Sequence, residues 1–453
     1  MSQPSRRLLP TNQDRPRMSS SPTPETSVSR VVLASFIGTT IEWYDFFLYG
    51  TAAALVFNQL FFPTLDPKAG TMAAFGTYAV GFFARPVGGI VFGHFGDRMG
   101  RKSMLVTTLM LMGSATFLIG VLPTYDQIGV AAPAMLVFLR FVQGFGVGGE
   151  WGGAVLMTVE HGHRGRRGLY ASWVQAGVPA GLLLATGVFN ACTLLPESAF
   201  MSWGWRIPFL LGIGLLGVGM FIRLQVFESP LFAEVRDRQK QAGLPVLEVL
   251  RQYPRNLLLA MGARFAENGS FYVFTVFILS YATEQLSVSR TVVLNGVLIA
   301  SAVQFFVIPV FGILSDRIGR RPVYLCGAAG LAAFAFPFFW LVDSTSNGLI
   351  ILAIVSGLIV HAAMYAPQAA FFSELFGTSV RYTGASIGYQ LASPLAGGLA
   401  PLISMALLEW AGGRPWPVAI YLIVLSAITL VSVWLAAETH RAELGEHRAA
   451  TSP

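Results

Sequence analysis

The chain carries little charge for its length: aspartate, glutamate, lysine and arginine together make up 12% of its 453 residues. Soluble domains typically contain about 25%, so a soluble protein of this size would have too few charged side chains to cover its surface. Cysteine is also scarce: the chain has only Cys192 and Cys326. They fall near opposite ends of their spans, so we expect no disulfide between them. The sequence shows no convincing cluster of metal-ligating residues. We therefore expect no metal and no cofactor.

Apolar residues account for 54% of the chain, and they gather into twelve long runs. Runs of about 20 apolar residues are long enough to span a bilayer as helices. The expected spans are 31–57, 70–92, 103–122, 132–158, 169–194, 205–226, 256–281, 291–313, 323–342, 347–372, 384–408 and 416–437. The sequence therefore predicts an all-α membrane protein with twelve transmembrane helices. The net charge of +7 is a topology signal, so we expect no nucleic-acid partner.

The charged residues predict the orientation and the domain boundaries. With both termini in the cytoplasm, nearly all lysines and arginines outside the spans fall on the inner side, as the positive-inside rule requires. Residues 1–30 are rich in Ser, Pro, Thr and Arg and predict a disordered cytoplasmic tail. After this tail we expect four parts: a six-helix half at 31–226, a cytoplasmic linker at 227–254, a second six-helix half at 255–437 and a cytoplasmic tail at 438–453. We expect a multi-pass monomer of a cell inner membrane.

One charged decapeptide occurs twice, each time between two apolar spans. Residues 93–102 read Gly-His-Phe-Gly-Asp-Arg-Met-Gly-Arg-Lys, and residues 312–321 read Gly-Ile-Leu-Ser-Asp-Arg-Ile-Gly-Arg-Arg. Repetition across half a chain indicates two similar six-helix halves. A tight charged turn between membrane helices indicates a cytoplasmic face that moves.

The repeated decapeptides predict a cytoplasmic gate. An acid at a helix C-terminus is unfavourable unless positive charge compensates it, so each decapeptide aspartate should face the positive end of a helix in the opposite half. The motif glycines should permit a tight turn, and the last arginine of each motif core should reach a glutamate of its own half. Such contacts would favour the outward-open state. The residues assigned to this gate are Gly93, Asp97, Arg98, Gly100, Arg101, Glu160, Arg167, Asp316, Arg317, Gly319, Arg320, Glu374 and Arg381.

Three further segments carry a family resemblance. Residues 38–50 read Gly-Thr-Thr-Ile-Glu-Trp-Tyr-Asp-Phe-Phe-Leu-Tyr-Gly, residues 85–89 read Arg-Pro-Val-Gly-Gly, and residues 140–153 read Arg-Phe-Val-Gln-Gly-Phe-Gly-Val-Gly-Gly-Glu-Trp-Gly-Gly. With the twelve spans and the repeated decapeptides, the chain resembles the major facilitator superfamily and, within it, the metabolite:proton symporter family. The resemblance implies two rocking halves, proton-driven uptake of an organic acid or zwitterionic osmolyte, and gate contacts with helices eleven and five.

Charged residues inside the spans are candidates for function, because each costs roughly 2.5–3.5 kcal/mol on insertion scales. Asp45 in the first span and Arg140 in the fourth lie at similar depth, on helices that the resemblance places together. We hypothesise that Asp45 is the main proton acceptor, with Arg140 as its modulating partner and Glu42 as the second choice. The alternative is a buried ion pair that only fixes helix packing.

A second charged pair, Arg264 and Glu267, lies on the seventh span. An arginine binds both oxygens of a carboxylate, so Arg140 and Arg264 would suit an organic anion in a central cavity; alternatively, Glu267 neutralises Arg264, which then only braces its helix. Arg85 is expected in the inner part of the second span, nearer to its inner than to its outer end, where it could snorkel or brace the gate. His361 is either a proton relay or a hydrogen-bonded core residue. The residues assigned to substrate binding are Arg140, Arg264, Glu267, Gln143, Tyr272 and Tyr44.

The sequence predicts a secondary active transporter that couples protons to uptake of a small carboxylated metabolite. Its expected partners are that organic acid or zwitterionic metabolite, protons and the lipid bilayer. The alternative is a proline- or betaine-type osmolyte symporter, which the short C-terminal tail disfavours. A drug exporter would need a more apolar cavity, and a nutrient sensor would need a signalling domain. An enzyme is not expected, because no nucleophile and base are suitably placed.

Overall fold

The computed structural model describes residues 27–65, 67–163, 165–225, 244–442 and 444. Most of the predicted tail at 1–30 and of the linker at 227–254, and the end of the tail at 438–453, lie outside these ranges. Every regular element in the described ranges is helical. Ten of these helices are each long and apolar enough to cross a membrane. With α3 and α12 beside them, they form the twelve expected spans.

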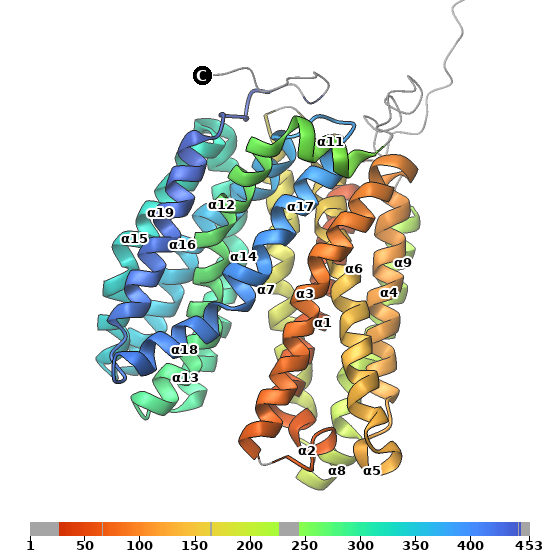
Figure 1. Cartoon of the computed structure of the whole chain (residues 1–453), viewed down its shortest axis with the longest axis vertical. Coiled ribbons are helices and arrows are strands. Elements are labelled where there is room, and N and C mark those ends of the chain that lie inside the picture. The colour runs from red at the N-terminus through yellow and green to blue at the C-terminus, as the bar shows by residue number, and fades with distance from the viewer. Residues whose placement is uncertain (1–26, 66, 164, 226–243, 443, 445–453) are drawn as a thin grey trace, which may run out of the picture.

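The first six spans form one bundle (Figure 1). Its long helices are α1 (Val28–Ala52), α3 (Pro67–Met99), α4 (Arg101–Val121), α6 (Ala131–His161), α7 (Arg167–Cys192) and α9 (Ile207–Leu224). Its short elements are η1 (Ala53–Phe57), α2 (Asn58–Leu60), α5 (Tyr125–Ile128), α8 (Glu197–Ser202) and η2 (Gly204–Arg206). Within the bundle α1 packs on α7, and α6 packs on both α3 and α4.

The last six spans form the second bundle. Its long elements are α12 (Pro254–Tyr272), α14 (Arg290–Ile318), α15 (Arg320–Asp343), α16 (Asn347–Glu374), α17 (Arg381–Ser393), α18 (Ala400–Trp410) and α19 (Trp416–Leu435). The short elements are α11 (Pro245–Gln252), η3 (Val273–Phe277), α13 (Ile278–Ser280), η4 (Tyr281–Gln285) and η5 (Pro394–Gly398). Here α16 packs on α14 and α15, and α19 packs on α12 and α15.

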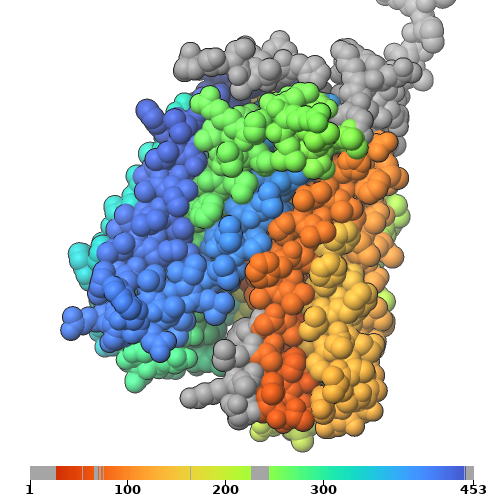
Figure 2. Space-filling view, in the orientation of Figure 1, coloured from red at the N-terminus to blue at the C-terminus, as the bar shows by residue number. Residues whose placement is uncertain are grey.

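The two bundles meet through equivalent helices. Helix α3 of the first half packs against α17 of the second, and α7 packs against α14. Helix α11 lies at one end of the molecule, against α3 and α17 (Figure 2). Both decapeptides lie at this end, which we call the decapeptide end. In Figure 1 the bundles approach each other at this end and diverge toward the opposite one.

Three of the spans are interrupted by π-helical turns that the apolar pattern does not predict. These turns are η1 after α1, η3 and η4 after α12, and η5 after α17. A π-turn inserts an extra residue into the helical ladder, and such turns often occur at functional sites. The interrupted spans include the two that carry Asp45 and Arg264.

Candidate functional site

A small cavity lies between the halves. The first half contributes Trp43 of α1 and Val178 of α7. The second half contributes Arg264, Glu267, Asn268, Phe271, Tyr272, His361, Tyr365 and Tyr389. The cavity is lined mostly by aromatic rings with a few charged and polar groups, which is the usual composition of a small-molecule site.

The charged groups of the second half form one network beside this cavity. Arg264 and Glu267 are joined by a buried ion pair, as their spacing predicts. Gln368 donates to Glu267 over 3.1 Å, and its amide oxygen accepts from Arg264 over 3.1 Å. The Nε2 atom of His361 lies 3.1 Å from Glu267 Oε1, and the Arg264 guanidinium lies 3.4 Å from the centre of the Tyr389 ring. Glu267 therefore neutralises Arg264 where both line the cavity.

A chain of hydrogen bonds connects Asp45 with Arg140 in the first half. Thr116 donates to Asp45 Oδ2 over 2.7 Å, Gln143 Nε2 donates to the Thr116 hydroxyl over 2.7 Å, and Arg140 Nη1 donates to Gln143 Oε1 over 3.2 Å. All four side chains are buried. The carboxylate and the guanidinium therefore form no direct ion pair in the described ranges, because two neutral side chains on α4 and α6 lie between them.

Arg85 takes neither of the roles that the sequence suggested for it. Its side chain is 3% exposed and sits against the rings of Trp43, Phe46 and Phe82. It is about 21 Å along α3 from the end of that helix at Met99, so it neither snorkels nor braces the gate. The faces of aromatic rings attract a guanidinium, and they hold this one deep within the first half.

Two other expected residues have different surroundings. Tyr44 is fully buried, and its hydroxyl donates to the Pro208 carbonyl of α9 over 2.7 Å; it faces the interior of the first half and is not a cavity residue. Glu42 is buried near the middle of α1, and its Oε2 atom has no hydrogen-bond partner among the described residues.

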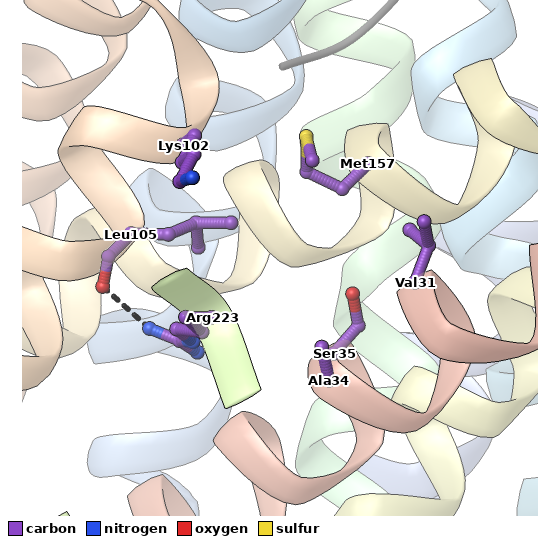
Figure 3. A pocket seen from close by; sticks show the side chains of 7 residues that line it. All are labelled: Val31, Ala34, Ser35, Lys102, Leu105, Met157 and Arg223. Carbon is purple, nitrogen blue, oxygen red and sulfur yellow. Dashed lines mark hydrogen bonds between the residues drawn. The ribbon is translucent and has the colours of Figure 1, made fainter. Parts of the chain in front are cut away.

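The structure also contains a buried ion pair that the sequence reasoning missed, between Glu150 of α6 and Arg223 of α9. Thr108 donates to the same carboxylate over 2.8 Å. Glu150 lies inside the fourth span, so its cost in the membrane could have identified it; Arg223 was hidden by its position near a helix end. Arg223 also reaches the Leu105 carbonyl (Figure 3). It borders a second pocket within the first half, separate from the cavity between the halves.

At the decapeptide end, each motif aspartate lies against the N-terminus of a helix in the other half, as expected. Asp97 accepts the backbone N–H groups of Tyr382 and Thr383 in α17, over 3.2 and 2.9 Å. Asp316 accepts those of Gly168 and Leu169 in α7, over 2.8 and 2.9 Å. A carboxylate is stabilised at the positive end of a helix.

Glu160 joins arginines from both halves. It accepts from Arg101 of the first decapeptide over 3.1 Å and from Arg381 of α17 over 2.9 Å. Arg381 also donates to the carbonyl of Leu444 near the C-terminus.

An equivalent cluster surrounds Glu374. Arg320 of the second decapeptide donates to it over 3.3 Å, and Arg167 of α7 in the opposite half lies 3.8 Å away. Each glutamate thus connects its own half to the other, and together these clusters close the decapeptide end.

The motif glycines serve two purposes, and only one was expected. Gly100 and Gly319 adopt φ values of 113° and 108° at the turn, which favour glycine. Gly93 instead permits close approach, because an added Cβ would lie 2.8 Å from the α17 backbone. Arg98 and Arg317 are exposed and make no recorded contact with the opposite half within the described ranges, so their assignment to the gate is wrong.

Comparisons with known proteins agree with this architecture. A sugar (and other) transporter family model matches residues 31–244, and the major facilitator superfamily model matches residues 257–451. The shikimate transporter of Escherichia coli K12 is 43% identical, covering 91% of this chain and 95% of its own. The E. coli inner membrane metabolite transport protein YhjE is 40% identical, covering 93% of this chain and 97% of its own. The E. coli proline/betaine transporter is 34% identical, covering 89% of this chain and 82% of its own.

A solved structure shares the fold. The proton:xylose symporter XylE bound to 6-bromo-6-deoxy-D-glucose superposes with a TM-score of 0.78, with 17% identity, covering 92% of this chain and 98% of its own. The matching family models describe transporters and the relatives are transporters, in agreement with the prediction that the chain is not an enzyme. The chain therefore belongs to the major facilitator superfamily, among its multi-pass membrane transporters of small metabolites, and is not an enzyme.

Proposed function

We propose that the chain is a proton-coupled symporter that takes up a small carboxylated metabolite, with the decapeptide end facing the cytoplasm. The observation that carries the proposal is the buried hydrogen-bonded chain from Asp45 to Arg140. The names of the relatives support it, because shikimate, proline and betaine each carry a carboxylate. The neighbouring fold is that of a protein named as a proton symporter.

Asp45 is the proton acceptor of this proposal. One carboxylate oxygen accepts from Thr116, whereas Oδ1 has no recorded partner and remains available for a proton. Protonation would remove the negative charge of Asp45, which is linked to Arg140 by the hydrogen bonds described above. A buried cation without a compensating anion is costly, so the protonated state would favour binding of a substrate carboxylate. Glu42, one helical turn away, is the second candidate.

The second half would contact the rest of the substrate. Arg264, Glu267 and Tyr272 line the cavity, and Glu267 already neutralises Arg264. We assign this pair to hydrogen bonds with uncharged polar groups such as hydroxyls, which a buried network can recognise without a change of charge.

Alternating access would depend on the gate. The clusters around Glu160 and Glu374 include arginines of both halves, so they form only when the decapeptide end is closed. We assign the structure to a state that is closed toward the cytoplasm. Substrate would be released to the cytoplasm once the gate contacts break.

The test is uptake into proteoliposomes that contain the purified protein. Labelled shikimate, proline and glycine betaine would be supplied with and without an acid-outside pH gradient. We expect the gradient to drive accumulation of shikimate above equilibrium, and a protonophore to abolish it. Accumulation of betaine and proline without shikimate would favour the osmolyte alternative. Equal uptake with and without the gradient would contradict proton coupling.

A further inference from the structure

We propose that Arg85 is a second carboxylate-binding guanidinium, which together with Arg140 holds the substrate's acid group beside Phe46. The inference rests on the proposed function, in that the substrate carries a carboxylate. It replaces the expected pairing of Arg140 with Arg264.

Both arginines are buried against the same ring. The guanidinium carbons of Arg85 and Arg140 lie 4.5 and 5.0 Å from the centre of Phe46, and the side chains are 3% and 2% exposed. Arg140 also contacts the rings of Tyr49 and Tyr78, at 4.3 and 4.8 Å. Helices α1, α3 and α6 thus bring two positive charges into one aromatic enclosure.

Hydrogen-bond donors in this enclosure are left without acceptors. The Nε and Nη2 atoms of both Arg85 and Arg140 are buried and have no partner among the described residues. A buried donor without an acceptor destabilises the protein, and the cost is larger when the donor is charged. Contact with a ring face does not satisfy these donors, because guanidinium N–H groups lie in the plane of the group. An acid group with two oxygens supplies the acceptors that are missing.

The distribution of ion pairs marks these two arginines as different from the other buried ones. Arg264 is paired with Glu267, and Arg223 is paired with Glu150. For Arg85 and Arg140 no ion pair is recorded within the ranges that the structure describes. Asp45, on α1, reaches Arg140 only through two neutral side chains.

Two aromatic side chains connect the enclosure with the central cavity. Arg85 lies 5.6 Å from the centre of the Trp43 ring, and Trp43 lines the cavity. Phe82, another ring that Arg85 contacts, packs edge-on against Tyr272 of the cavity wall, with ring centres 5.6 Å apart. A substrate in the cavity can therefore direct its carboxylate toward Arg85 and Arg140 once these rings turn.

The test measures equilibrium binding by calorimetry, using the purified full chain in nanodiscs. The probes are shikimate and glycine betaine, each compared with its methyl ester, which differs only in the acid group. For at least one probe we expect the wild type to bind the acid about tenfold or more tightly than the ester. Arg85→Gln should bring this ratio close to one. Arg85→Lys should retain part of the preference, because it keeps the charge and loses the fork.

Arg206 provides a matched control. It also stacks on an aromatic ring, 4.4 Å from the centre of Trp205, but donates to the carbonyls of Gly120 and Leu122. Arg206→Gln should leave the acid-to-ester ratio unchanged.

Two results would overturn the inference. One is equal wild-type affinity for each acid and its ester. The other is an unchanged acid-to-ester ratio in Arg85→Gln, which would indicate a structural brace if the variant binds both ligands more weakly. If Arg85→Gln does not fold, the acid-to-ester ratio in Arg85→Lys tests the inference instead. An undiminished preference for the acid in this variant would show that the guanidinium of Arg85 does not bind the carboxylate through its fork. Failure of proton-driven uptake by the wild type would instead contradict the proposed function, whatever the binding ratio.

Discussion

The Asp97 carboxylate of the first half accepts the backbone N–H of Thr383 in the second, over 2.9 Å. Asp316 makes the equivalent contact with α7 in the opposite direction. Each carboxylate closes the decapeptide end at the positive terminus of a helix, and both contacts break when the halves separate there. The two aspartates therefore bias the balance between the conformational states.

We expect Asp97→Asn to increase the population that is open at the decapeptide end. The amide keeps the size of the side chain but loses the charge-assisted hydrogen bonds, which are worth about 1.5–3 kcal/mol. The measurement is the rate of thiol labelling at Ser386→Cys, in a background without Cys192 and Cys326. Ser386 is fully buried on α17 and faces Gly152 of the other half. Labelling should accelerate about tenfold or more.

Asp126→Asn is the matched control for this experiment, because Asp126 is exposed on α5 at the opposite end of the molecule. It should leave the labelling rate unchanged. An unchanged rate in Asp97→Asn itself would argue against a gate.

Asp45→Asn should abolish proton-driven accumulation while leaving substrate exchange. The amide can still accept from Thr116 but cannot bind and release a proton, so a pH gradient no longer drives uptake. In proteoliposomes we expect accumulation to fall at least about tenfold, with counterflow of preloaded substrate retained. Full accumulation in this variant would shift the assignment to Glu42.

Glu267→Gln should destabilise the protein more than removal of the whole ion pair. The single change leaves Arg264 buried without its anion, which typically costs about 3–5 kcal/mol. In the double variant Arg264→Gln/Glu267→Gln no charge is left uncompensated, so its Tm in detergent should exceed that of Glu267→Gln. A lower Tm in the double variant would mean that Gln368, whose amide oxygen accepts from Arg264, compensates the guanidinium without the anion.

Glu438→Gln should lower stability in a pH-dependent way. The Glu438 carboxylate accepts the backbone N–H groups of Arg320 and Arg321 at the start of α15, each over 2.9 Å. Burial alone would raise the pKa of Glu438, but hydrogen bonds from backbone N–H groups outweigh it and lower the pKa below its usual value of 4.5. The stabilisation that a carboxylate with a lowered pKa provides is complete above pH 4.5. It is lost as the pH falls through the lower pKa of the folded state.

The variant should therefore be less stable than the wild type at neutral pH, by about 0.5–2 kcal/mol as for other lost helix caps. The difference should narrow below pH 4.5, as measured by Tm across the acid range. Glu409→Gln, at an exposed position on α18, should show no such narrowing. A constant difference at every pH would mean that charge on Glu438 is irrelevant to the cap.

Much of the gate was predictable because it depends on repeated local sequence. The two copies of the motif place Asp97 and Asp316 at equivalent turns, and an acid at a helix C-terminus requires a positive partner. Arg98 and Arg317 were assigned incorrectly because the motif does not show which side of the helix end faces the other half.

The binding region was predictable only in part. The cost of charge in a membrane identified Asp45, Arg140, Arg264 and Glu267, but it gives no information about neutral residues such as Thr116, which joins the first two. The direction of Arg85 was also hidden, because a helix that is apolar all round has no face that marks the interior.

The number of spans, the two halves and the closing motif follow from the amino-acid sequence alone, because the length of apolar runs, repetition and the cost of charge in lipid specify them. Which arginines are neutralised, and which keep free donors, depends on the folded structure. That outcome depends on the rotation of each helix about its axis and on contacts between residues far apart in the chain, neither of which a linear pattern specifies.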